Sequence, residues 1–518
     1  MSFEFNLIDQ PWIPVLDSSG IPREVSLSDV LINAQRYLQL SASFPQTNAA
    51  LYRLLLAVLH RNFGPKNDDE WQQLWLAQQF NRQALEGYFA QWYPRFDLFA
   101  PDRPFMQARQ PKTEPKPANA LLFLVAGGDP DTLYNHNLDS VPIILTPQQA
   151  AQALITAHSF GIAGLCHPQL KLVYTDAPCA RGAVFFLQGR NLFESLMLNL
   201  VRYTPAEPIP FHGDEPDRPA WEMDDPYMPD RSVPFGYLDY LTWQNRCIML
   251  FPSEVDGKTV VQKVTTSSGL AINAELSNPM HHYRIDEKTG RKILRFTEGR
   301  ALWRDSSVLL NLKSGNFNPQ AICWAEELIA YGYLPAQKLK LAAYGMSTAP
   351  GKQKVHFYRG EQFEFSNELL TRQDLIDTLD YALELAHELR NQLWGAMRRL
   401  AQLILSSEAD LQNGRTPDPN DIENLIVHWE GESQYWSRLE VPFMHFLDLL
   451  PADQEQALEE WRKSIRSAVL NAFNYTTQQS GSQPKALKAA AIARVQMLSG
   501  IKKVLVPQTQ EENNAIHA

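Results

Sequence analysis

Apolar positions recur on a helical period along the last third of the chain. From Leu375 to Leu405 they occupy positions i, i+3, i+4 and i+7 for about eight turns. Three further segments repeat the pattern, at Ile422–Leu450, Gln454–Phe473 and Lys485–Val504. Pro442 lies inside the second and is expected to kink or start a helix there. Four amphipathic segments with short connections predict an up-and-down four-helix bundle.

The first two thirds of the chain mix strand-like and helical patterns with proline-rich loops. Phe5–Val15 carries two prolines and predicts an edge strand. Asn48–Phe63 predicts a helix that ends at Gly64-Pro65, and Thr146 is expected to cap a helix that runs to about Phe160. The sequence therefore predicts an α+β fold, with a mixed α/β globular N-terminal domain over residues 1–365 and the bundle over residues 366–518.

Composition limits how the chain could meet nucleic acid. The chain has 518 residues, of which 44% are hydrophobic, and its net charge at pH 7 is -11. A polyanion would be repelled by this overall charge, so the chain is not expected to coat nucleic acid by itself. Any contact must come from local basic loops, or from docking on a partner that already holds the nucleic acid.

Other sequence signals argue against an enzyme, a secreted protein and a membrane protein. The four cysteines form no C-x-x-C pair, so neither a structural zinc site nor a disulfide framework is indicated. His281-His282 lacks a third metal ligand, and neither a Walker loop nor a G-x-S-x-G elbow is present. Apolar runs are far shorter than a membrane span, and no signal peptide is recognised. We expect a cytoplasmic protein without catalysis, cofactor or membrane contact.

A turn near residue 350 carries the most suggestive local chemistry. Pro350-Gly351 is a turn dipeptide, and Val355–Tyr358 with Gln362–Phe365 predict two short strands of a hairpin after it. This turn would present Lys352, Gln353 and Lys354. An amide between two cations suits a protein that grips phosphates and inserts a polar group among bases. The alternative is a solvated hairpin tip.

Several motifs, taken in order, resemble one family. They are Asn6–Val15, Arg103–Gln107, Thr132–His136, Thr175–Pro178 with Ala180–Gly182, Asn191–Leu200 and Gly299–Asp305. Together they resemble the CasA family, the large subunit of the type I-E CRISPR surveillance complex called Cascade. The similarity runs over nearly the whole chain.

The resemblance implies the same two-part fold and a non-catalytic role. In this family the subunit recognises the protospacer-adjacent motif on duplex DNA, opens the duplex beside it and recruits a helicase-nuclease. The implied partners are therefore the other Cascade subunits, the guide RNA, target double-stranded DNA and the helicase-nuclease effector.

The resemblance also implies DNA-binding residues. A glutamine wedge in the family matches Gln353 in the loop Gly351–Lys354, which includes Lys352 and Lys354. A lysine finger in the family matches Lys263, with Lys258 as the next candidate. A strand-edge lysine is also commonly just solvated, so both interpretations of these lysines remain open.

Two further loops match the family. Its glycine-rich loop corresponds to Phe160–Gly164, where Gly161 and Gly164 would approach the groove, although the stretch holds fewer glycines than usual. A helix C-cap at Gly161 is the alternative. The loop that touches the guide RNA and the motif duplex corresponds to Phe123–His136. Its candidate residues are Phe123, Gly127, Gly128 and Asn135. Phe123 could instead pack in the core, and Asn135 could be a turn residue.

Two rival functions come from other classes. The chain could be a soluble metabolic enzyme with a helical appendage, its site in the proline-rich Thr204–Pro234 excursion. It could also be a scaffold that binds only protein.

Overall fold

The computed structural model describes residues 3–108, 113–122, 143–167, 172–202, 215–286, 288, 290–313, 315–348, 355–407, 413 and 415–505. The chain divides into two compact units. The first comprises Met1–Leu302 and Leu312–Phe363, and the second comprises Trp303–Asn311 and Glu364–Ala518. The second unit therefore takes in Trp303–Asn311, a segment that the sequence analysis counted with the first domain.

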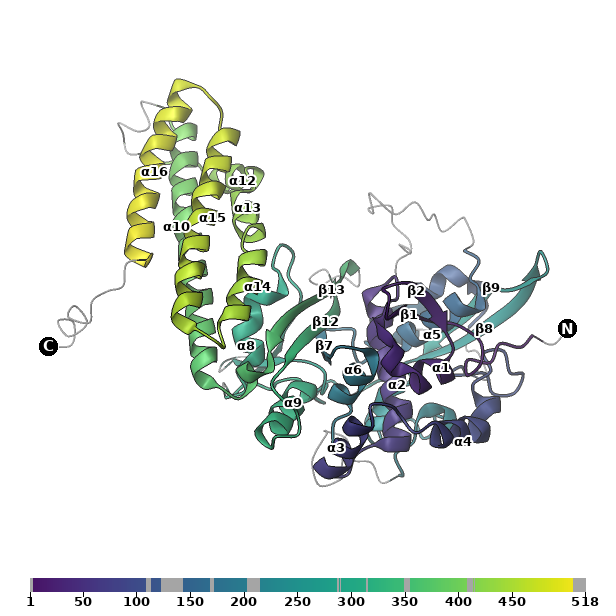
Figure 1. The fold of residues 1–518 in the computed structure, drawn as a ribbon. Coiled ribbons are helices and arrows are strands. Elements are labelled where there is room, and N and C mark those ends of the chain that lie inside the picture. Colours follow the sequence, from purple (N-terminus) through teal and green to yellow (C-terminus); the bar gives the residue numbers. More distant parts are fainter. Residues whose placement is uncertain are drawn as a thin grey trace. The chain divides into compact units, whose positions relative to one another are not determined.

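Strands are concentrated in the first part of the chain (Figure 1). They are β1 (Ile13–Asp17), β2 (Pro22–Val25), β3 (Tyr37–Leu40), β4 (Lys116–Pro117), β5 (Gly164–His167), β6 (Leu172–Tyr174), β7 (Ala183–Gln188), β8 (Arg246–Val255), β9 (Lys258–Ser268), β10 (Tyr283–Asp286), β11 (Gly290–Ile293), β12 (Lys338–Thr348) and β13 (Val355–Ser366). Within the described ranges they form the sheets β2-β1-β3, β4-β9-β8 and β13-β12-β7 and the pairs β5-β6 and β10-β11.

Helices of the first unit pack around these small sheets. They are α1 (Leu27–Ile32), α2 (Pro45–Phe63), α3 (Asp68–Ala77), α4 (Arg82–Trp92), α5 (Pro147–Phe160), α6 (Leu192–Asn199), α7 (Tyr237–Leu241) and α9 (Gln320–Ala330). The predicted N-cap of α5 is confirmed, because the Thr146 hydroxyl accepts from the Gln149 backbone N–H. The side chain of Gln149 bonds in return to the Thr146 backbone N–H, which completes a capping box.

Helix α2 forms the centre of the core of the first unit. It contacts α5, α6 and α7, and almost all of its middle turns are buried. The Tyr52 ring stacks on Phe186 of β7, with ring centroids 4.8 Å apart. The buried Arg53 guanidinium donates to the Tyr240 carbonyl oxygen of α7 at 2.6 Å. A helix surrounded in this way must be largely apolar all round, which explains the long apolar run of its sequence.

The predicted edge strand at Phe5–Val15 is wrong in position. Strand β1 starts only at Ile13 and lies between β2 and β3. Pro14 is tolerated in this strand because the N–H that proline lacks would face β3, and β3 ends at Leu40 before it reaches this position. On the same side, the Pro14 carbonyl oxygen accepts from the N–H of Ser41, the residue after β3, at 2.9 Å.

The predicted hairpin within Val355–Phe365 is also wrong, because β13 is one continuous strand beside β12. The polar residues in the middle of β13 form hydrogen bonds with residues 297–302. Arg359 donates to the Thr297 and Arg300 carbonyl oxygens, and Glu361 accepts from the Leu302 N–H. A Cβ on Gly360 would lie 2.9 Å from Pro45, so this glycine permits a close approach and makes no turn.

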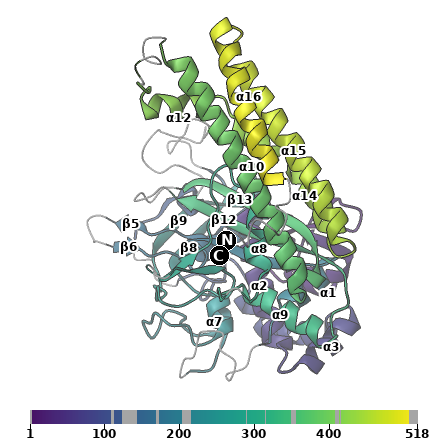
Figure 2. The ribbon, with the colours of Figure 1, turned by 90° about the vertical axis from the view of Figure 1, so that its left-hand side faces the viewer.

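The second unit is helical. Its helices are α8 (Ser306–Leu310), α10 (Gln373–Leu405), α12 (Pro419–His428), α13 (Gly431–Ser437), α14 (Glu440–Leu449), α15 (Gln454–Gln479) and α16 (Pro484–Leu505). Figures 1 and 2 show α10, α15 and α16 side by side. The second predicted segment is divided into α12, α13 and α14, and Pro442 lies in the first turn of α14. The predicted four-helix bundle is confirmed, with three short helices in one of its four positions.

Aromatic side chains fill the interior of the bundle. The Trp303 ring stacks on Phe443 at 4.5 Å and meets Trp461 edge-on at 6.4 Å. Trp461 also donates to the Ala382 carbonyl oxygen at 2.7 Å. These contacts explain why the Trp303–Asn311 segment belongs to the helical unit. Throughout the described part of the chain, every helix is too short or too polar to cross a membrane.

Candidate nucleic-acid interface

Strands β8 and β9 form a long antiparallel hairpin at one side of the first unit (Figure 1). Its turn consists of Asp256 and Gly257, with φ of 50° and 71°. Positive φ at both central residues is the signature of a type I′ turn, for which Asp-Gly is a preferred pair. Lys258 is the first residue after the turn, so the turn holds this lysine at the tip of the hairpin.

An extra residue in β9 brings the two candidate lysines to one face of the hairpin. Phe251 pairs with Lys263 whereas the next residue, Pro252, pairs with Val261, so Gln262 is left without an opposite residue. In a regular strand, Lys258 and Lys263 would point to opposite faces because they are an odd number of residues apart. The bulge at Gln262 reverses this alternation. Both lysines therefore share a face.

Both lysine side chains are available to a ligand. Lys258 and Lys263 are exposed, and neither ammonium group has an ion pair or hydrogen bond among the described residues. Lys263 does not stand at a sheet edge, because β9 lies between β4 and β8. The backbone of Lys263 pairs with Pro117 of β4 inside the sheet, so only its exposed side chain is available to a ligand.

The flanks of the segment 123–142 meet on β9 beside Lys263. Before the segment, Pro117 pairs with Lys263; after it, Leu145 forms a bridge with Val261, with hydrogen bonds of 2.8 and 3.0 Å. The Asn119 side-chain oxygen also accepts from the Ile143 N–H at 2.8 Å. The chain therefore leaves and returns next to the candidate lysine.

Gly161 ends α5 and is buried under an arginine. A Cβ at this position would lie 2.6 Å from Nη2 of Arg246 and 2.8 Å from the Ala157 carbonyl oxygen. The Arg246 guanidinium lies 4.4 Å from the centre of the Tyr174 ring and donates to the Ile162 carbonyl oxygen at 2.8 Å. Close packing against Arg246 therefore explains why a glycine is needed at position 161. Its role near a groove stays a separate prediction.

Gly164 begins β5 and lies in the hairpin that packs on β9. It pairs with Tyr174 of β6, and the Tyr174 hydroxyl lies 2.6 Å from the Thr266 hydroxyl of β9. The structure thus brings Gly164, Lys263 and the flanks of segment 123–142 to the same strand. None of these placements tests a contact with nucleic acid, so the roles of Gly161, Gly164, Lys258 and Lys263 stay predictions.

Other predicted site residues lie outside the described residues. They are Gly351, Lys352, Gln353 and Lys354 in the connection between β12 and β13, and Phe123, Gly127, Gly128 and Asn135 in the segment before Ile143. The roles expected of these residues therefore stay predictions.

Three organising residues were missed by the sequence analysis. Arg246 and Asn119 act through partners far along the chain, so no local pattern marks them. Pro252 did offer a signal, because proline inside a strand is confined to edges, first residues and bulges. Pro252 lies inside β8, where the pairing with β9 shifts opposite Gln262.

Two buried histidines of the first unit have hydrogen bonds that fix their rings. His281 is 3% exposed and its Nε2 accepts from the Asn278 amide at 3.1 Å; burial lowers its pKa to about 3. Nε2 of His158 donates to the Met106 carbonyl oxygen at 2.9 Å, and burial lowers its pKa to about 4. Both rings are therefore neutral at pH 7. Across the described ranges, no three His, Cys, Asp or Glu side chains are placed to hold a metal ion.

Comparisons with known proteins place the chain among CRISPR-associated proteins. The family model for CRISPR-associated protein Cse1 matches residues 6–472. A CasA/Cse1 protein of Thermus thermophilus is 32% identical over 499 residues, which cover 94% of this chain and 95% of that protein.

Solved structures agree with these matches. The crystal structure of CasA from Thermus thermophilus has a TM-score of 0.80 and 29% identity, covering 97% of this chain and 100% of that chain. The crystal structure of Cse1 from Acidimicrobium ferrooxidans, at 24% identity, shares the fold with a TM-score of 0.80 over 97% of this chain and 99% of that chain. Since the family model spans most of the sequence and the relative is similar along nearly its whole length, the chain belongs to the CRISPR-associated Cse1 (CasA) family.

Proposed function

We propose that the chain is a non-catalytic subunit of an RNA-guided DNA surveillance complex. In this role it recognises the protospacer-adjacent motif in duplex DNA, wedges the duplex open to start R-loop formation and recruits a helicase-nuclease. Family membership supports a place in such a complex. The observation that carries the DNA contact is the gathering on β9 of Lys263, the hairpin that begins at Gly164 and the flanks of segment 123–142.

Electrostatics favours this hairpin as a contact. The chain has a net charge of -11, so a cation must stand clear of the acidic surroundings to meet a phosphate or a groove. Lys258 and Lys263 share one face of the hairpin, whereas Glu254 pairs with Thr259 and points to the opposite face. Asp256 of the turn is the acidic residue next to Lys258 in the sequence. The minor groove offers a degenerate donor and acceptor pattern, so lysines there would accept several motifs.

Alanine substitution of the two lysines tests the contact. In the assembled complex, Lys258→Ala and Lys263→Ala are each expected to weaken binding of motif-bearing duplex. If each lysine contacts a phosphate, the dependence of log K on log salt should become less steep by about 0.9 per lost contact. Duplex binding is measured by mobility shift at several salt concentrations. Lys66→Ala, an exposed lysine after α2, is the matched control and should change neither value.

If both hairpin variants bind duplex like Lys66→Ala, the hairpin is not the DNA contact. Thermal unfolding should be unchanged in all three variants, because the ammonium groups of these lysines form no hydrogen bond or ion pair among the described residues and the substitutions keep their backbone bonds.

The proposed wedge is tested separately. Opening a base step costs a few kcal/mol of unstacking, which must be recovered from phosphate contacts and RNA–DNA pairing. Gln353→Ala is therefore expected to slow target-strand opening on linear DNA while barely changing folding. Opening is followed by fluorescence of a base analogue beside the motif. An unchanged R-loop rate for this variant would remove Gln353 from the proposal and leave the lysine contact standing.

A further inference from the structure

Helix α16 exposes its large aliphatic side chains and buries mostly small ones. It is the outermost long helix of the bundle on the left of Figure 1. Its buried residues are Ala486, Ala489, Ala493, Met497, Gly500 and Ile501. Its exposed large apolar residues are Leu487, Ile492, Val495 and Leu498, of which Val495 is 70% exposed. An outer helix is expected to turn its apolar stripe to the core, so α16 presents an apolar face that the described residues do not cover.

The small residues hold α16 close to α10. A Cβ on Gly500 would collide with the Gln392 side chain of α10. At the other end of α16, the Lys485 ammonium donates to the Ile404 and Ser406 carbonyl oxygens at 2.6 Å, where α10 ends. Turning α16 to bury its aliphatic side would break these bonds and place large side chains where small ones fit. The packing therefore fixes the outward direction of the aliphatic face.

The exposed face follows a seven-residue spacing. Lys488, Val495 and Lys502 follow one another at intervals of seven residues, so they lie along one line of the helix, about 10 Å apart. Ile492 and Leu498 lie three residues before and after Val495, so they flank this line on either side. A second helix that packs along α16 would meet the same repeat.

This face is positively charged in an acidic chain. Helix α16 has five basic residues and no acidic one, whereas the whole chain has a net charge of -11. Lys488 and Lys502 are exposed, and their ammonium groups form no hydrogen bond or ion pair among the described residues. A partner that covers the aliphatic centre must therefore also neutralise these two cations.

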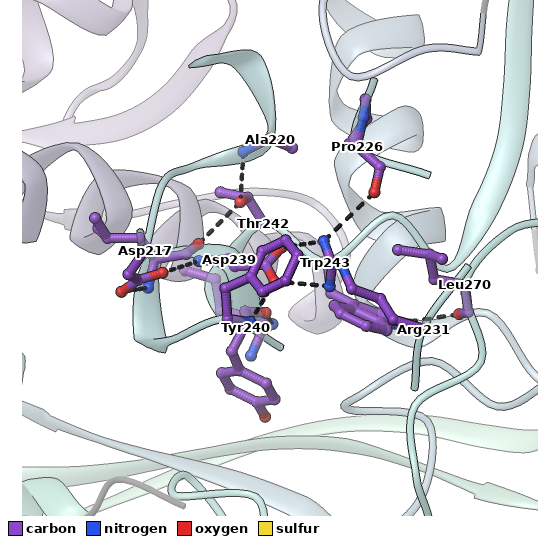
Figure 3. Close-up of polar contacts among 12 residues, drawn as sticks. Asp217, Ala220, Pro226, Arg231, Asp239, Tyr240, Thr242, Trp243 and Leu270 are labelled. Atoms are coloured by element: carbon purple, nitrogen blue, oxygen red, sulfur yellow. Dashed lines mark hydrogen bonds and ion pairs between the residues drawn. The ribbon is translucent and has the colours of Figure 1, made fainter. Parts of the chain in front are cut away.

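An arginine of the first unit shows how the chain itself pairs a largely buried cation (Figure 3). Arg231 bonds to the two oxygens of the Asp239 carboxylate at 2.8 and 3.0 Å and donates to the Pro226 carbonyl oxygen at 3.4 Å. Pairing of this kind is needed wherever a cation loses its water. Lys488 and Lys502 would lose their water under a partner, so the partner must supply the carboxylates.

We propose that the outer face of α16 docks an acidic amphipathic helix of a protein partner. Apolar side chains of that helix would cover Val495 and its two flanking residues. Carboxylates two turns to either side of this centre would pair with Lys488 and Lys502. The docking face contains none of the residues proposed to contact DNA.

Other ligands match this face less well. Phosphates could pair with the lysines, but they would not cover the aliphatic side chains between them, and α16 has no aromatic side chain on which a base could stack. A second copy of the chain would set lysines against lysines at both ends of the contact. An acidic helix matches both the aliphatic centre and the two charges.

The test uses the full-length chain and its charge-reversed double variant, Lys488→Glu/Lys502→Glu. The probes are the purified protein subunits of the surveillance complex and the helicase-nuclease, and their choice rests on the proposed function. Each is tested separately for binding to the immobilised chain. We expect one of them to bind the double variant at least about 10-fold more weakly than the unchanged chain. Lys488→Arg/Lys502→Arg, which keeps both charges, should retain that affinity.

Lys66→Glu/Lys288→Glu is the matched control, because it makes the same charge change at exposed positions outside α16. It should leave the affinity unchanged, and thermal unfolding of both charge-reversed variants should match that of the unchanged chain. The proposal is overturned if no protein loses affinity for the α16 variant, or if the control lowers the affinity equally. If the unchanged chain binds none of the probes, the proposed function is overturned as well.

A photocrosslinker in place of Val495 identifies what covers the face. In the assembled complex it should link to an acidic helix of the protein that lost affinity. The same group in place of Val441, which is exposed on α14, should not link to that helix. The complex is assembled on a duplex target and mixed with vesicles of anionic lipid, so that these ligands compete. A link to nucleic acid, to lipid or to a second copy of the chain, or no link, overturns the proposal.

Discussion

At the scale of single residues, Gly161 shows how a packing constraint can be told from a functional one. Gly161→Ala would place a methyl group against the Arg246 guanidinium and the rigid end of α5, so we expect a loss of about 1–3 kcal/mol in the free energy of unfolding. Gly87→Ala is the control. Gly87 lies in α4 with open space around it, and alanine there should stabilise by up to about 1 kcal/mol. Urea unfolding measures both values.

The same variant separates the two interpretations of this glycine. If Gly161 serves only packing, the alanine variant that remains folded should bind duplex as the unchanged complex does. If the bare backbone also approaches a groove, duplex binding should fall in that folded fraction as well. Equal stability of the two alanine variants would instead show that Arg246 moves aside easily.

At the scale of elements, the bulge in β9 makes a geometric prediction. Inserting one threonine between Phe251 and Pro252 would give Gln262 a partner, restore regular alternation and turn Lys258 to the face opposite Lys263. Deleting Gln262 also removes the bulge, but it leaves the two lysines on one face. We therefore expect the insertion to weaken duplex binding as much as Lys258→Ala, and the deletion to retain binding. Equal binding by both variants would mean that the shared face is irrelevant.

Elements marked by local signals were predictable from sequence, and those set by distant partners were not. Gly64-Pro65 and Thr146-Pro147 mark the limits of α2 and α5 through the chemistry of the helix ends themselves. The Arg359-Gly360-Glu361 stretch has the composition of a turn, but bonds to residues 297–302 keep β13 extended. The same limit holds for the candidate site. Lys258 and Lys263 were identified from the family resemblance, but their common face could not be predicted because it depends on how β9 pairs with β8.

At the scale of the whole molecule, the acidic charge of -11 predicts dependence on partners. Long-range repulsion opposes the approach of a duplex, and a few exposed lysines offer too few phosphate contacts to overcome it at physiological salt. In the complex, neighbouring subunits and the guide RNA would hold the duplex close, which raises its effective concentration at the hairpin. The isolated chain should therefore bind duplex weakly.

This dependence can be measured with a duplex pool whose positions beside the target are randomised. We expect the guide-bound complex lacking this chain to bind the pool without selection, and addition of the chain to enrich particular motifs while raising affinity at least 10-fold. The Lys258→Ala/Lys263→Ala chain is expected to join the complex but to enrich no motif, because the substitutions remove the two cations proposed to contact the duplex. If the isolated chain bound and selected duplex as tightly as the complex does, its local charges would suffice, and the dependence on partners would be refuted.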